Sequence, residues 1–142
     1  HKGVQMLNIA LKVASEYHAG QVDKAGRDYI NHPIAVANLV DTENEKIVAL
    51  LHDIIEDTDM TIEKLKCYGF SADIILAIKT LTKDNECDYF KYLQNVKKDK
   101  LARIVKLADL KHNSDLTRLK TVTDEDLKRT EKYRKAIEYL EK

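Results

Sequence analysis

IVALLHDIIEDT, residues 47–58, is the most informative segment of this 142-residue chain. Its apolar residues recur at three- and four-residue spacing, so we expect one continuous helix over residues 43–57. At about 100° of rotation per residue, the polar side chains all fall on one side of that helix: His52, Asp53, Glu56 and Asp57. Any surface helix separates polar from apolar residues, so this separation alone does not indicate a function.

The spacing HDxxED is more specific than the amphipathic pattern. A His-Asp pair is expected roughly 0.5 times by chance in this chain, and the full HDxxED pattern roughly 0.003 times. Crowded carboxylates repel one another, and a divalent cation is the simplest compensator. We therefore expect His52 and Asp53 to bind a metal ion. Glu56 and Asp57, one turn onward, are candidates to accept a proton from an attacking water or to orient it.

One dipeptide supplies only two ligands, so such a site needs others from elsewhere in the chain. His32, at the start of the next helix upstream, is one candidate, although a helix-end histidine can be satisfied by the backbone alone. Asp109 is the other, because it ends an otherwise apolar stripe, although simple exposure would also explain it. Mixed histidine and carboxylate ligation suits Mn²⁺ or Fe²⁺, and Zn²⁺ and Mg²⁺ stay open.

The remaining chain shows helical periodicity without sustained two-residue alternation, which predicts an all-α, single-domain helical bundle over residues 1–142. Asn31 is expected to cap one helix, with Pro33 in its first turn. Ser71 and Thr123 are expected to cap two others, Ser71 with a staple from Phe70. Expected helices cover residues 4–20, 31–40, 61–68, 72–81, 88–96, 100–111 and the segment from 123 onward.

The charges balance, with 24 basic and 24 acidic residues, so we expect neither nucleic acid nor a membrane surface as a partner. Apolar runs are too short to span a membrane. The two cysteines form no CxxC pair, and no signal peptide is evident, which favours a cytoplasmic location. A basic cluster is interpreted as a solvated helix connection: Lys97, Lys98, Lys100, Arg103 and Lys106.

Five elements together resemble the HD-domain metal-dependent phosphohydrolases, and more narrowly the stand-alone (p)ppGpp hydrolases of the RelA/SpoT hydrolase family. In family order over about residues 6–120, they are HAGQ at 18–21, YINHP at 29–33, LLHDIIEDT at 50–58, LTK at 81–83, and KLAD at 106–109 with Asn113. This ordered set is far more specific than any one motif.

The resemblance implies an HD fold in which one Mn²⁺ is held by His32, His52, Asp53 and Asp109. It also implies that Glu56 and Asp57 serve the attacking water, and that Asn113 lies beside the ribose or phosphate of a nucleotide. The implied reaction removes the 3′-pyrophosphate of (p)ppGpp and yields GDP or GTP.

The expected substrate site departs from the family pattern. Asp23 stands where relatives usually carry a basic residue that holds guanine, and Asp28 replaces a common proline. Lys24 and Arg27 are candidates to pack on a base, and Tyr29 belongs to the same motif region. Lys106 and Arg118 are candidate phosphate partners on charge alone.

Two alternatives to (p)ppGpp hydrolysis stay open. One is an HD phosphohydrolase that acts on another nucleotide, with the same metal ligands and a different base pocket. The other is a noncatalytic helical module that binds a nucleotide or a protein. The length of 142 residues leaves no room for the synthetase region of bifunctional relatives, so we expect hydrolysis only. The sequence indicates no oligomeric state.

Overall fold

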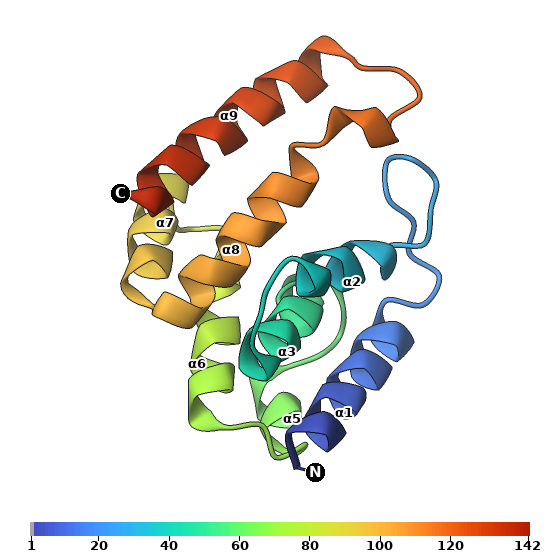
Figure 1. Ribbon diagram of the computed structural model, residues 1–142, viewed down its shortest axis with the longest axis vertical. Coiled ribbons are helices and arrows are strands. Elements are labelled where there is room, and N and C mark those ends of the chain that lie inside the picture. Colours follow the sequence, from blue (N-terminus) through green and yellow to red (C-terminus); the bar gives the residue numbers. More distant parts are fainter. Residues whose placement is uncertain (1) are drawn as a thin grey trace.

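A computed structural model of the protein describes residues 2–142, and its secondary structure is helical, as expected (Figure 1). Within these residues the only β-type pairing is an isolated bridge between Val22 and Asp28. The elements are α1 Lys2–Tyr17, α2 Asn31–Asn38, α3 Glu43–Leu51, α4 Ile54–Asp57, α5 Ile62–Lys66, α6 Ala72–Leu81, α7 Tyr89–Lys98, α8 Lys100–Asn113, the 3₁₀ helix η1 Leu116–Arg118, and α9 Asp124–Glu141.

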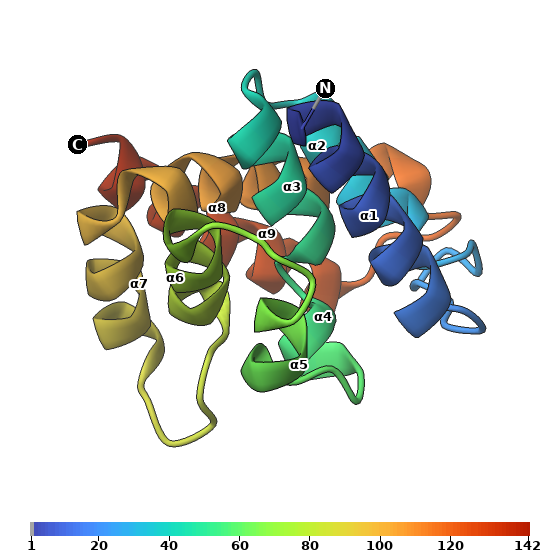
Figure 2. The same ribbon diagram turned by 90° about the horizontal axis from the view of Figure 1, so that it is seen from below.

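Helix α3 lies at the centre of the bundle and contacts α1, α2, α6 and α8 (Figure 2). Its apolar residues are almost fully enclosed, with Ile47 1% exposed and Val48 and Leu51 at 0%. Full burial of such a side chain stabilises the fold by about 1.5–3 kcal/mol. The same apolar run that predicts a helix therefore also anchors the other helices around it.

Two of the three expected helix caps are present. The hydroxyl of Ser71 accepts from the amide of Ile74, and Thr123 and Asp126 form a reciprocal capping box at the start of α9. The expectation for Asn31 is wrong, because Asn31 is the first residue of α2 and Ile30 precedes it without a side-chain cap. The preceding turn already supplies acceptors: the Asn31 amide donates to Asp28 O, and the His32 amide to Tyr29 O.

The expectation of one continuous helix over residues 43–57 is also wrong. The helix stops after Leu51, and α4 begins at Ile54. The His52 ring provides the local reason, because its Nδ1 lies 2.5 Å from Ala49 O. In an uninterrupted helix, that carbonyl would accept from the amide of residue 53. The break changes the direction of the Asp53 side chain relative to Glu56 and Asp57.

Other boundaries differ from expectation by a few residues. Helix α1 ends at Tyr17 and α2 at Asn38, whereas α8 extends two residues beyond Lys111. Helix α5 is shorter than expected, and the turn after it passes through Gly69 with φ +88°, a left-handed conformation that glycine adopts without strain. Of the helices in residues 2–142, none is long and apolar enough to cross a membrane.

Candidate active site

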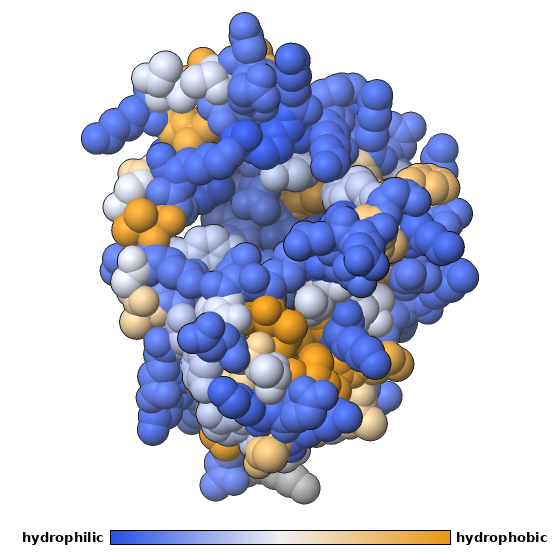
Figure 3. Space-filling view, turned by 180° about the vertical axis from the view of Figure 1, so that it is seen from behind, coloured by the Kyte–Doolittle hydropathy of each residue, from blue (hydrophilic) through white to orange (hydrophobic). Residues whose placement is uncertain are grey.

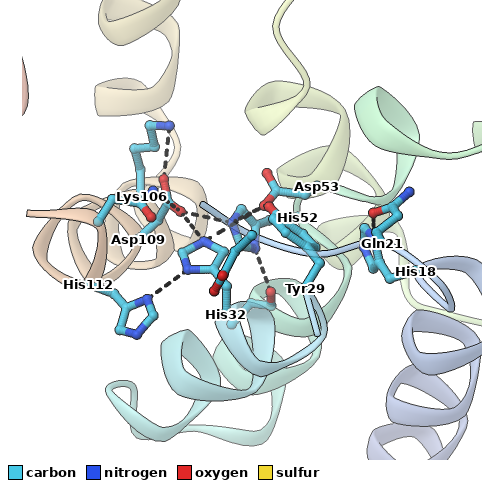
Figure 4. A network of polar contacts seen from close by, with 12 residues as sticks. His18, Gln21, Tyr29, His32, His52, Asp53, Lys106, Asp109 and His112 are labelled. Atoms are coloured by element: carbon cyan, nitrogen blue, oxygen red, sulfur yellow. Dashed lines mark hydrogen bonds and ion pairs between the residues drawn. The ribbon is translucent and has the colours of Figure 1, made fainter. Parts of the chain in front are cut away.

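Four side chains from three parts of the chain converge on one another (Figure 4). His32 comes from α2, His52 and Asp53 from the turn after α3, and Asp109 from α8. One ligand atom from each lies within 4.8 Å of the other three. The Nε2 atoms of His32 and His52 lie 2.8 and 3.1 Å from the same oxygen, Asp109 Oδ1. We call these four residues the quartet.

The quartet is largely closed to solvent. His32, His52 and Asp109 are 3–5% exposed, and the Asp53 side chain is 20% exposed. Carboxylates and imidazoles buried together need compensating partners, and two nitrogen and two carboxylate donors facing one point suit a divalent metal ion. The four side chains proposed from the sequence as metal ligands therefore do come together.

Lys106 and Asn113 complete the surroundings of Asp109. Lys106 Nζ donates to Asp109 Oδ2 at 3.1 Å, and Asn113 Nδ2 donates to Oδ1 at 3.3 Å. Burial would raise the pKa of Asp109, but Lys106 and the hydrogen bonds from both histidines outweigh it and hold that pKa well below its usual value. Asp109 is therefore a carboxylate, able to bind a cation.

The ring of each quartet histidine is oriented by a second contact. The His52 ring contacts Ala49 O through Nδ1, which leaves Nε2 facing Asp53 and Asp109. Nδ1 of His32 lies 2.7 Å from Nδ1 of His112, within hydrogen-bond distance. The two rings stack with their centroids 4.9 Å apart. Such outer contacts set which nitrogen a histidine offers to a metal.

His112 is a site residue that the sequence analysis missed. It lies three residues after Asp109, so both side chains fall on the same side of α8. That spacing is the signal that could have identified it, but its target, His32, is 80 residues away in the chain. Only the packing of α2 against α8 brings the two rings together.

Tyr29 joins the quartet through its hydroxyl, which donates to Asp53 Oδ2. Burial, followed by the nearby Asp53 charge, raises the pKa of Tyr29 far above its usual value. The phenol therefore stays protonated and keeps its donor role. The residue was expected at the substrate site, and it both lines the adjoining cavity and touches a quartet carboxylate.

Glu56 and Asp57 have exposed side chains, and each residue makes a hydrogen bond with a different part of the chain. The Glu56 carboxylate accepts from the backbone amide of Lys83, just after α6. The Asp57 backbone carbonyl accepts from Gln21 Nε2 at 2.8 Å, and Gln21 Oε1 contacts His18 Nδ1, also at 2.8 Å. The sequence expectation that these carboxylates lie near the quartet is compatible with the structure, which adds the neighbours that position them.

Burial is the largest influence on both carboxylates, and it raises the pKa of Glu56 and of Asp57. The negative charge of Asp53 raises both pKa values further. A carboxylate with a raised pKa is a better proton acceptor once ionised, which is the property a general base requires.

A cavity of about 320 Å³ adjoins the quartet and shares Tyr29 and His32 with it. Residues 22–25 and Tyr29, the end of α8, η1 and α9 contribute its walls. The face of the molecule opposite to that of Figure 1 is hollowed in its upper half, with mostly hydrophilic residues around the hollow (Figure 3). Four proposed substrate-binding residues line the cavity: Lys24, Tyr29, Asn113 and Arg118.

The other two proposed substrate-binding residues do not line this cavity. Lys106 is paired with Asp109 and lies with Nζ 5.4 Å from the centre of the Tyr92 ring. Arg27 is exposed, and its backbone amide donates to Asp23 Oδ1. The charge of Lys106 is therefore directed to a quartet carboxylate, a role that charge alone did not predict.

Comparison with known proteins points to one group. The chain is 36% identical over 115 residues to the guanosine-3′,5′-bis(diphosphate) 3′-pyrophosphohydrolase of Haemophilus influenzae, covering 71% of this chain and 17% of that protein. It is 33% identical over 125 residues to the bifunctional (p)ppGpp synthase/hydrolase SpoT of Escherichia coli K12, covering 78% and 18%. No family model matches the chain.

Among solved structures, one similar protein is a metazoan ortholog of SpoT that hydrolyses ppGpp. The match has a TM-score of 0.76 at 26% identity, and it covers 95% of this chain and 84% of that one. A helical bundle that gathers a His-Asp pair with a second histidine and a second aspartate is an HD-type protein. The chain is, more narrowly, a RelA/SpoT hydrolase-like protein. It spans 17–18% of the length of the two bacterial relatives.

Proposed function

We propose that this protein is a metal-dependent phosphohydrolase that removes the 3′-pyrophosphate of (p)ppGpp and yields GDP or GTP. The observation that carries the proposal is the convergence of the quartet beside a cavity large enough for part of a nucleotide. The names of the bacterial relatives and of the similar solved structure support the substrate.

The quartet residues His32, His52, Asp53 and Asp109 would hold the metal, for which we propose Mn²⁺ because mixed histidine and carboxylate donors suit it. A divalent cation bound there supplies Lewis-acid chemistry, because it offsets charge on phosphoryl oxygens and makes a water easier to deprotonate. The contacts of His112, Ala49 O and Tyr29 keep the ligand atoms pointed at one place.

Glu56 is the proposed general base and Asp57 the proposed water-orienting group. The water oxygen forms a bond to the phosphorus that carries the ribose 3′-oxygen, while Glu56 takes the water proton. The bond from that phosphorus to the 3′-oxygen breaks, the proton taken by Glu56 is returned to the 3′-oxygen directly or through solvent, and pyrophosphate leaves with the water oxygen on the attacked phosphorus. The raised pKa of Glu56 makes its carboxylate a better proton acceptor than an ordinary glutamate.

The cavity beside the quartet is the proposed nucleotide site. Asn113 reaches both Asp109 and the cavity, so it is placed to contact the ribose or a phosphate. Lys24 and Arg118 add positive charge to the cavity wall for an anionic ligand. Arg27 and Lys106 do not line the cavity, so we propose no substrate contact for either residue.

The test is Mn²⁺-dependent release of pyrophosphate from ppGpp, compared with release of phosphate from a panel of other nucleotides. We expect release from ppGpp to be fastest and to be lost when a chelator removes the metal. Faster turnover of another nucleotide would identify a different HD phosphohydrolase. Metal-free protein with no turnover on any nucleotide would favour the noncatalytic module.

Three further expectations stay predictions: a cytoplasmic location, hydrolysis without ppGpp synthesis from ATP and GDP, and a single domain over residues 1–142. The synthesis assay uses the same purified protein and detects ppGpp directly. Formation of ppGpp from ATP and GDP would contradict the second expectation.

A further inference from the structure

Tyr92, a buried residue of α7, contacts two other helices through two parts of its side chain. Its hydroxyl donates to Leu81 O, at the end of α6, at 2.7 Å. Its ring lies beside α8, where Lys106 Nζ is 5.4 Å from the ring centre, close enough for a cation–π contact. One side chain therefore ties α7 both to the end of α6 and to the lysine that pairs with Asp109.

The hydroxyl of Tyr92 satisfies a carbonyl that α6 itself leaves free. Leu81 is the last residue of α6, and the carbonyl groups of the last turn have no partner within a helix. A buried carbonyl without a partner is costly, so this bond stabilises the end of α6. It also fixes the point at which the chain enters the loop of residues 82–88, which joins α6 to α7 (Figure 2).

The loop has one hydrogen bond to a distant part of the chain. Among the described residues, all the other hydrogen bonds of residues 82–87 stay within residues 78–88. The exception is the Lys83 amide, which donates to the Glu56 carboxylate. Lys83 lies two residues after Leu81, so the place of its amide depends on how the end of α6 is held.

We propose that Tyr92 is a positioning residue for catalysis, because its hydroxyl fixes the end of α6 and thereby the Lys83 amide that holds Glu56. This inference rests on the proposed function, in which Glu56 takes the proton of the attacking water. A general base must lie within hydrogen-bond reach of that proton, so a Glu56 side chain that turns away slows the chemical step. Tyr92 does not line the cavity beside the quartet, so we expect no effect on nucleotide binding.

Tyr92→Phe tests the proposal with the smallest change, because it keeps the ring beside Lys106 and removes only the hydroxyl. We expect kcat for ppGpp to fall by about tenfold or more, the range seen when outer contacts of a site are lost. KM and Mn²⁺ affinity should stay within about twofold of the wild type, because the lost contact acts on the chemical step. Steady-state kinetics and calorimetry measure the three quantities.

The same change in the Glu56→Gln background separates positioning of Glu56 from a general loss of structure. If the hydroxyl acts through Glu56, Tyr92→Phe should lower the residual kcat by less than about twofold there, since residues that act as a unit are not additive. Partial unfolding would lower kcat by the same factor in both backgrounds. An equal loss in the two backgrounds would therefore overturn the proposal.

Tyr89→Phe is the matched control in the same helix. The Tyr89 ring also carries a lysine, with Lys132 Nζ 4.0 Å from its centre. Within residues 2–142 the Tyr89 hydroxyl makes no hydrogen bond to another group, so its removal breaks no tie to α6. This variant should keep the wild-type kcat, KM and Mn²⁺ affinity.

Hydrogen exchange of the Lys83 amide, followed by NMR in metal-free protein, tests the positioning without any turnover. We expect exchange to be about tenfold faster in Tyr92→Phe than in the wild type or in Tyr89→Phe, because the loop opens more readily. Unchanged exchange or an unchanged kcat in Tyr92→Phe would overturn the inference. Faster exchange in a protein whose wild type hydrolyses no ppGpp would refute only the proposed function.

Discussion

Asp109 and Asp23 are both carboxylates at the same candidate site, yet they are held in opposite ways. Asp109 has both oxygens engaged: the two histidines and Asn113 contact Oδ1, and Lys106 donates to Oδ2. Asp23 has one oxygen fixed by its own turn and the other without a hydrogen bond in the turn or to Arg118.

The difference extends to the regions around them. The quartet is carried by α2, α8 and the turn between α3 and α4, and its side chains are mostly buried against the core, where a side chain cannot shift without disturbing its neighbours. About half of the cavity-lining residues belong to residues 22–29 and η1, which are short segments outside the longer helices, and their lining side chains are partly or fully exposed. Rigid positions suit the chemical step, and loop positions can change specificity without loss of the fold.

Asp53→Asn tests the quartet most severely. Removal of one ligand charge should abolish stoichiometric Mn²⁺ binding and lower kcat/KM for ppGpp by about 10³-fold or more. Metal analysis of the purified variant and a turnover assay check both effects. If the variant keeps one Mn²⁺ per chain, Asp53 is not a ligand; an Asp23→Asn variant, which leaves the quartet intact, should bind metal normally.

Glu56→Gln separates proton transfer from metal binding. The amide keeps the size of the side chain but cannot take a proton, so kcat should fall by about 10² to 10⁴-fold while metal content stays at the wild-type level. Glu63→Gln, at an exposed position of α5, is the control and should change neither quantity. A wild-type rate in Glu56→Gln would remove the proposed role of this residue.

His112→Ala tests how much metal binding by the quartet depends on a contact from a residue outside it. Without its partner nitrogen, the His32 ring loses orientation, and Mn²⁺ affinity should fall by about 10 to 100-fold. His112→Asn, which can restore a hydrogen-bonding group, should recover part of that loss. Calorimetry measures Mn²⁺ binding to the wild type, His112→Ala and His112→Asn, and partial recovery in His112→Asn distinguishes lost orientation from simple unfolding. Equal Mn²⁺ affinity in the three proteins would argue against a positioning role for His112.

The pH profile reports the partly exposed carboxylates beside the quartet. A general base works only when ionised, and burial raises the pKa of Glu56, so activity should fall at a higher pH than an ordinary carboxylate would cause. The loss is expected as the pH drops through that raised value. Measurement of kcat/KM against pH checks the position of this acid limb. If the residual kcat/KM of Glu56→Gln falls at the same pH as that of the wild type, Asp57 or another group is responsible for the loss of activity at low pH.

Thr123→Ala perturbs the start of α9, which carries no quartet residue, and should have the smallest effect. Thr123 caps α9, and loss of its hydroxyl should lower the free energy of unfolding by about 1 kcal/mol. Mn²⁺ stoichiometry should not change. Denaturant unfolding and metal analysis of the same preparation check the two expectations, and a loss of metal would show that α9 supports the quartet after all.

Much of this protein could be predicted from local patterns in the sequence. Helical periodicity, the HDxxED spacing and the caps at Ser71 and Thr123 all depend on residues within a few positions of one another. Asp109 could be proposed because it ends an apolar stripe, and His32 because it is a histidine at the start of a helix. The sequence could not show which side chains either residue would contact.

Only the tertiary structure decided which polar groups meet. The Tyr29 hydroxyl reaches Asp53 across 24 residues of chain, His32 reaches Asp109 across 77, and Lys106 is directed to Asp109 rather than to the cavity. The break after Leu51 likewise depends on a side chain that bonds to the backbone in place of an amide. Periodicity and capping are short-range effects, whereas the partner of a buried polar group depends on how the helices pack.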